Sequence, residues 1–87
     1  MILIIFSPKI TNIPFTTLEY LECNFCGELK SIDCKSLIEI VCDECYSLEY
    51  IYAENAEYIA SNNGKSNLII KAPIDCKRRI TYIKSWC

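Results

Sequence analysis

Apolar side chains and cysteines recur along this chain with a 19-residue period. The clearest copies are residues 18–36 and 37–55, which superpose without a gap. The matched positions are Leu18 with Leu37, Leu21 with Ile40, Cys23 with Cys42, Cys26 with Cys45, Leu29 with Leu48, Ile32 with Ile51, and Cys34 with Ala53. Such a period is typical of a solenoid, because one unit cannot bury its own apolar face and stacking on its neighbours does so.

The period extends toward the N-terminus. Residues 1–17 form a partial unit, in which moving back by one period places Ile2 below Leu21 and Ile4 below Cys23. Both N-terminal isoleucines are therefore predicted to point into the stack, and Leu3 between them to point outward.

The period also extends toward the C-terminus, where it weakens. Residues 56–74 form a fourth unit, but Leu68 lies one residue beyond the place where a leucine is due. This offset indicates a one-residue insertion after Gly64. Beyond Pro73 the pattern ends, so residues 75–87 are predicted to form a basic tail or cap.

Each unit is predicted to contain a short strand and a return arm that is extended or forms a single turn. The alternation in Leu-x-Cys suits a strand, and the eight residues of the second half are too few for a helix with its caps. The predicted fold class is a mostly β solenoid of about four such units over residues 1–74. In the tail, Ile80, Ile83 and Trp86 recur at a spacing that suits a short helical cap.

The units carry a recognisable motif. L-x-x-L-x-L-x-x-N/C is present over residues 18–26 and again over residues 37–45, and this pattern resembles the leucine-rich repeat. The arm over residues 10–14 is similar to the L-x-x-L-P arm of the short bacterial-type subclass. The cysteine-rich units are similar to repeat families encoded by large DNA viruses of amoebae. The resemblance implies a solenoid that binds other proteins and has no catalytic role.

The cysteines allow a second interpretation. Cys23, Cys26, Cys42 and Cys45 form two C-x2-C pairs separated by fifteen residues, a spacing that could supply four thiolates to one structural zinc ion. In a stack, the same side chains would form two columns that fill the interior and donate to neighbouring carbonyls. We favour the stack, without any cofactor, because it also accounts for the leucines and isoleucines. A small zinc-binding module is the alternative.

Charge is unevenly distributed along the chain. Residues 1–64 hold three Lys or Arg and ten Asp or Glu, whereas residues 65–87 hold six Lys or Arg and one Asp. A short basic tail on an acidic body makes nucleic-acid binding an unfavoured interpretation. No apolar run is long enough to span a membrane, and the apolar start lacks the basic residues of a signal peptide. With seven cysteines, an odd number, we expect reduced thiols and an intracellular location.

Outward strand positions define a candidate interaction face. Its members mix aromatic and acidic side chains: Tyr20, Glu22, Phe25, Glu39, Asp43, Glu44 and Tyr58. Aromatic residues are enriched at protein interfaces, so the expected partner is a basic or amphipathic protein of unknown identity. The chain lacks histidine and any nucleophile–base pairing, so we do not expect an enzyme. The apolar N-terminal edge over residues 1–6 is predicted to favour self-association.

Overall fold

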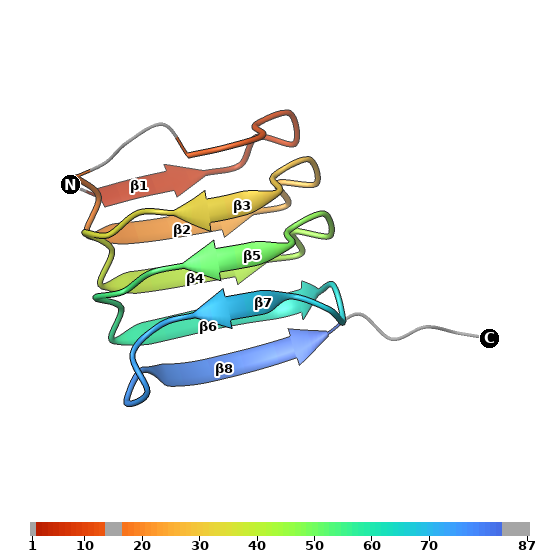
Figure 1. Ribbon diagram of the computed structural model, residues 1–87. Helices are drawn as coiled ribbons and strands as arrows, with labels where there is room; N and C mark the ends of the chain where they lie inside the picture. The colour runs from red at the N-terminus through yellow and green to blue at the C-terminus, as the bar shows by residue number, and fades with distance from the viewer. Residues whose placement is uncertain (1, 14–16, 83–87) are drawn as a thin grey trace.

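The chain folds into two parallel β-sheets packed back to back, a flattened β-solenoid of about four turns (Figure 1). The computed structural model describes residues 2–13 and 17–82. Within these ranges every regular element is a strand. The mostly β solenoid predicted from the 19-residue period is therefore confirmed. The molecule measures 40 × 29 × 15 Å, so it is thin across the two sheets.

We call the larger, five-stranded sheet the front sheet and the smaller one the back sheet. The strand order of the front sheet is β1-β2-β4-β6-β8. Their bounds are β1 Ile2–Ile5, β2 Tyr20–Asn24, β4 Glu39–Asp43, β6 Tyr58–Gly64 and β8 Lys77–Tyr82. All neighbours in this sheet are parallel. Parallel pairing follows from the solenoid path, because the chain returns through the other sheet before each new front strand begins.

The return arms pair into a second sheet, in the order β3-β5-β7. Its strands are β3 Ser31–Asp33, β5 Tyr50–Tyr52 and β7 Ile69–Lys71. Successive arms pair with the same 19-residue offset throughout. Of the two forms predicted for the return arm, the extended one is confirmed for these three units. Pro14, in the arm of the first unit, lies outside the described residues.

The core lies between the two sheets and follows the repeat. Leucine, isoleucine and cysteine side chains from both sheets are completely or almost completely buried there, including Leu21, Ile40 and Ile59 in one inward column of the front sheet. Leu68 is also buried, while β5 and β7 keep the 19-residue offset. The one-residue shift predicted after Gly64 is therefore confined to the corner that precedes β7.

One backbone conformation recurs directly after β2, directly after β4 and near the end of β6. Phe25, Glu44 and Asn63 follow one another at the repeat period and have φ angles of 58°, 56° and 56°. Only asparagine among these three tolerates the left-handed region well. The amide of Phe25 donates to the carbonyl of Asp43, and that of Glu44 to the carbonyl of Asn62, both at 2.8 Å. These corner hydrogen bonds continue the sheet ladder and offset the cost of the backbone conformation.

The register predicted for the first unit is wrong by one residue. β1 pairs with β2 so that Leu3 lies opposite Leu21 and Ile5 opposite Cys23, one residue short of the repeat period. Ile2 and Ile4 therefore point outward and are 70% and 55% exposed. The cause lies in the corner, where one residue separates Ile5 from Ser7 but two separate Cys23 from Cys26. Because strand side chains alternate, a one-residue slip exchanges the two faces of the strand.

The helical cap predicted for the tail is also wrong over its described part. Lys77–Tyr82 forms strand β8, which pairs with β6 at the usual 19-residue offset up to Ser61 and then shifts at a bulge. The open edge of β6 offers a row of unpaired backbone groups, and a strand satisfies them where an isolated short helix could not. Ile83 and Trp86 lie outside the described residues.

Over the described residues, the structure contains no helix that is long and apolar enough to cross a bilayer.

Candidate functional site

The outer surface of β2, β4 and β6 carries most of the predicted interaction residues. Tyr20 and Glu22 point outward from β2, Glu39 and Asp43 from β4, and Tyr58 from β6, because each alternates with buried neighbours. The strand register places Tyr20, Glu39 and Tyr58 in one column across the sheet. The structure therefore brings these five side chains together, and we call this surface the acidic face.

The two remaining predicted residues lie at the margin of the acidic face. Phe25 and Glu44 occupy equivalent left-handed corners, directly after β2 and β4. Phe25 is 57% exposed, which is high for an aromatic ring. The ring is therefore available for contact at the edge of the acidic face.

Hydrogen bonds hold the carboxylate of Glu22 in place. The amide of Asn24 donates to one of its oxygens at 2.9 Å, and the hydroxyl of Tyr20 donates to the other at 2.8 Å. These two donors, the Asn24 amide first, lower the pKa of Glu22 below its usual value. The same bond to Glu22 raises the pKa of Tyr20. At neutral pH, Glu22 therefore carries a fixed negative charge.

A second polar column crosses the same three strands, and its hydrogen bonds were not predicted from the sequence. Asn24, Asp43 and Asn62 lie in register at equivalent positions of β2, β4 and β6. The amide of Asn62 donates to the carboxylate of Asp43, and that of Asn63 donates to Glu44 at 3.3 Å. The 19-residue period aligns these residues, but it does not specify the hydrogen bonds between them. The hydrogen bonds orient both carboxylates along the same edge of the acidic face.

The four cysteines of the C-x2-C pairs line the interior of the stack. Cys23 and Cys42 lie opposite each other on β2 and β4. The Cys26 thiol donates to the carbonyls of Ile5 and Asn24 at 3.9 and 3.7 Å. The Cys45 thiol donates to the carbonyls of Cys23 and Asp43 at 3.5 and 3.7 Å. The predicted columns of buried thiols that serve neighbouring carbonyls are thus present.

Two of these thiols, Cys26 and Cys42, are poor nucleophiles. Burial is the main cause that raises the pKa of Cys26 to about 11. The pKa of Cys42 is raised well above its usual value, because the Cys23 and Cys45 thiols hydrogen-bond with it and because it is buried. The reactive species is the thiolate, so little of it forms at neutral pH.

The same thiols form the alternative zinc site. Across residues 2–13 and 17–82, no three or more His, Cys, Asp or Glu side chains are arranged to hold a metal ion. Zinc binding at Cys23, Cys26, Cys42 and Cys45 would therefore require the thiols to leave their carbonyl partners and converge.

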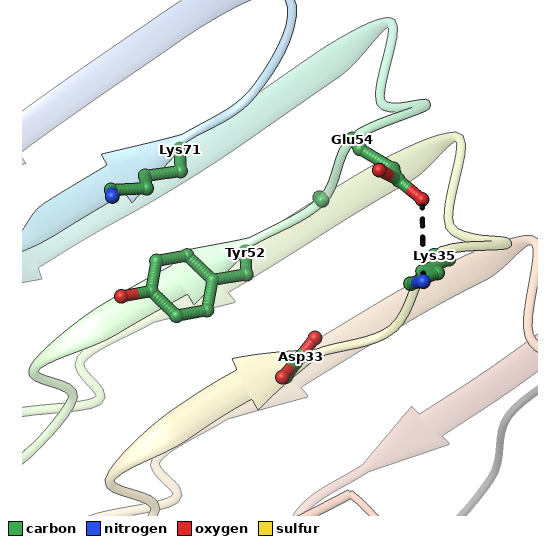
Figure 2. Close-up of a pocket in the computed structure, with 6 residues that line it drawn as sticks. Asp33, Lys35, Tyr52, Glu54 and Lys71 are labelled. Atoms are coloured by element: carbon green, nitrogen blue, oxygen red, sulfur yellow. Dashed lines mark ion pairs between the residues drawn. The ribbon is translucent and has the colours of Figure 1, made fainter.

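The back sheet carries a shallow groove that sequence reasoning did not find (Figure 2). It has a volume of about 450 Å³, and its lining residues are Asp33, Lys35, Tyr52, Ala53, Glu54 and Lys71. The Lys71 ammonium lies 5.6 Å from the centre of the Tyr52 ring, and Lys35 forms a 3.9 Å ion pair with Glu54. Positive and negative charges balance here, and the ion pair is highly exposed, so it adds little stability.

In comparisons with known proteins, no family model, no curated protein and no solved structure matches this chain.

Proposed function

We propose that this chain is a non-catalytic protein-interaction module of the leucine-rich-repeat type, which binds a basic protein segment through the acidic face. The observation that carries the proposal is the composition of that face and its margin. Four carboxylates and three aromatic rings lie on three neighbouring strands and their corners, without a basic side chain among them. Surfaces of this kind attract cationic partners and give them aromatic contact area.

Three features bear on the repeat type. The front strands are parallel and recur with the 19-residue period from β2 to β6. The ninth-position residues Cys26 and Cys45 donate to carbonyls in the interior, as the asparagine of related repeats does. The return arms pair into the back sheet, which makes the coil flat.

The non-catalytic role and an intracellular location belong to the same proposal. The sequence contains no histidine, and the thiols that the structure describes are buried and free of disulfides. Free buried cysteines suit a reducing compartment.

The proposal predicts selective binding of a basic peptide. The probe is a synthetic peptide of six lysine–leucine repeats. In an extended peptide this alternation places all lysines on one side, which can lie against a flat sheet. The triple variant Glu22→Gln, Glu39→Gln, Asp43→Asn should bind it at least about fivefold more weakly, since each removed charge weakens the attraction by a few tenths of a kcal/mol or more. Isothermal titration calorimetry at low protein concentration measures both affinities.

Two controls make this test specific. A peptide with glutamate in place of lysine should not bind, and the variant Glu54→Gln on the back of the molecule should bind the lysine peptide as the wild type does. Equal affinity of the wild type and the triple variant for the lysine peptide would contradict the proposal.

Zinc binding is a second candidate, favoured by one observation. Each of the four thiols interacts with two of the others inside the stack, in the order Cys23, Cys42, Cys45, Cys26 and back to Cys23. Native mass spectrometry of protein prepared with zinc, with and without a chelator, separates the two candidates. The interaction module predicts the bare protein mass and a thermal midpoint unchanged by chelation. One bound zinc, whose removal unfolds the chain, would establish the zinc module instead.

A further inference from the structure

Basic side chains of β8 continue the columns of the acidic face. Lys77 pairs in register with Tyr58, and so extends the column that contains Tyr20 and Glu39. In the next outward column the order across the sheet is Glu22, Val41, Ala60, Arg79. Lys77 and Arg79 are exposed. One flat surface is therefore acidic at β2 and β4 and basic at β8.

The two charged ends of this surface do not neutralise each other within one chain. Neighbouring strands lie about 4.8 Å apart, so β8 is about 10 Å from β4 and about 14 Å from β2. In the part of the chain that the structure describes, neither Lys77 nor Arg79 forms an ion pair. The charges remain available to a partner with the opposite order of charge.

We propose that a second copy of this chain is the partner of the acidic face, packed front to front about a two-fold axis. The axis runs parallel to the strands and lies between β4 and β6. This inference rests on the proposed function, because it uses the same face and names its occupant. A two-fold axis in this place reverses the order of strands in the second copy, so β2 faces the partner's β8 and β4 faces the partner's β6.

Opposed side chains in this arrangement are complementary. Glu22 lies opposite the partner's Arg79, and the symmetry makes this pair twice. Tyr20 lies opposite the partner's Lys77, which suits contact between an ammonium and an aromatic ring. Because both pairs occur twice, four favourable contacts form at the two ends of the interface.

The centre of the interface is also compatible with close approach. Val41 lies opposite the partner's Ala60, which brings a half-buried apolar side chain against a small one. Asp43 lies opposite the partner's Asn62, which can donate to it as Asn62 of the same chain already does. Among the outward strand residues that the structure describes, this arrangement sets no two like charges against each other. An unreversed stacking of the two faces would instead set Glu22 against Glu22.

The size of the surface sets the strength of the dimer. Four strands of about five residues cover roughly 19 by 16 Å. This is well below the roughly 800 Å² per partner of a standard interface, so the dimer should be weak and reversible. Much of its attraction is between exposed charges, so it should weaken as salt rises from about 0.05 to 0.5 M.

Exchanging charges between variants tests the two-fold arrangement directly. Arg79→Glu alone sets two pairs of carboxylates against each other, and Glu22→Arg alone sets two pairs of guanidinium groups against each other. Each variant alone should dimerise at least about tenfold more weakly than the wild type. An equimolar mixture of the two restores both opposite-charge pairs, so it should form a heterodimer. Sedimentation velocity over a range of concentrations at low salt measures all three.

The controls distinguish this dimer from association through another surface. Lys30→Glu makes a comparable change of charge on the back of the molecule and should dimerise as the wild type does, and matching thermal midpoints show that each variant folds. A wild type that stays monomeric, or a dimer that survives both single variants, overturns the inference; the second result would indicate association through the apolar edge of β1. Peptide binding at low concentration would still test the acidic face by itself in either case.

Discussion

Replacing Ile40 with alanine should lower the free energy of unfolding by about 2–5 kcal/mol, the largest loss expected from a single truncation in this chain. Ile40 is fully buried at the middle of the stack, with Leu21 on one side and Ile59 on the other in the same inward column. Removing its side chain leaves a cavity that touches three coils. A chain of this length has about 4–13 kcal/mol of stability in total, so the variant should be close to unfolding.

The matched control is Leu3→Ala in the end coil. Leu3 lies opposite Leu21 on one side only and is half-buried, so its truncation should cost less than half as much. Urea denaturation followed by circular dichroism measures both variants. A solenoid is stabilised by contacts between neighbouring coils, so equal losses at the two positions would contradict this origin of its stability.

The 19-residue period predicted the middle of the fold well, for a physical reason. Between residues 18 and 63 each corner has the same length, so every inward residue falls on its neighbour. Register is then fixed by burial, since any slip would expose the leucines and isoleucines. The positions of Tyr20, Glu39 and Tyr58 on one face follow from the same alternation.

The first strand could not be placed by the same reasoning. Residues 2–6 are all apolar, so either face of the strand could be buried and the pattern does not specify the register. The register depends on the length of the corner before Ser7, which is one residue shorter than the others. Corner length can be recognised only when the strand pairing is known.

The last strand had no apolar repeat to indicate it. Lys77, Arg78 and Arg79 occupy the positions of Tyr58, Ile59 and Ala60, so burial gives little reason for a strand there. Backbone pairing to the open edge of β6 provides that reason, and it acts independently of side-chain type. The basic part of the front surface was missed for the same cause.

The groove of the back sheet was not predicted from the sequence, for a different reason. Asp33, Tyr52 and Lys71 share one position of the 19-residue period, and the structure places them side by side. The period was sufficient to align them once the return arms were known to pair. The contact of Lys71 with the Tyr52 ring depends on side-chain rotamers, which a sequence pattern does not specify.

Raising the pH from 7.5 to 10.5 should lower the free energy of unfolding, and Cys26 should account for up to about 2 kcal/mol of the loss. Burial raises the pKa of this thiol from 9.0 to about 11 in the folded chain. The folded state therefore holds its proton more tightly than the unfolded state does. The stabilisation is complete below pH 9 and is lost as the pH rises toward 11, at about 1.4 kcal/mol for each unit of pKa difference.

The variant Cys26→Ser isolates this contribution. Serine already occupies the equivalent place in the first unit, at Ser7, and its hydroxyl does not titrate in this range. The pKa of Tyr20 is also raised, but its effect is common to both proteins and cancels in the comparison. The Cys42 and Cys45 pKa values are shifted in opposite directions, so their effects on the pH dependence oppose each other. Urea denaturation under reducing conditions at both pH values should therefore show a smaller loss of unfolding free energy for the variant than for the wild type. Equal losses would mean that the Cys26 thiol ionises as readily in the folded chain as in the unfolded one.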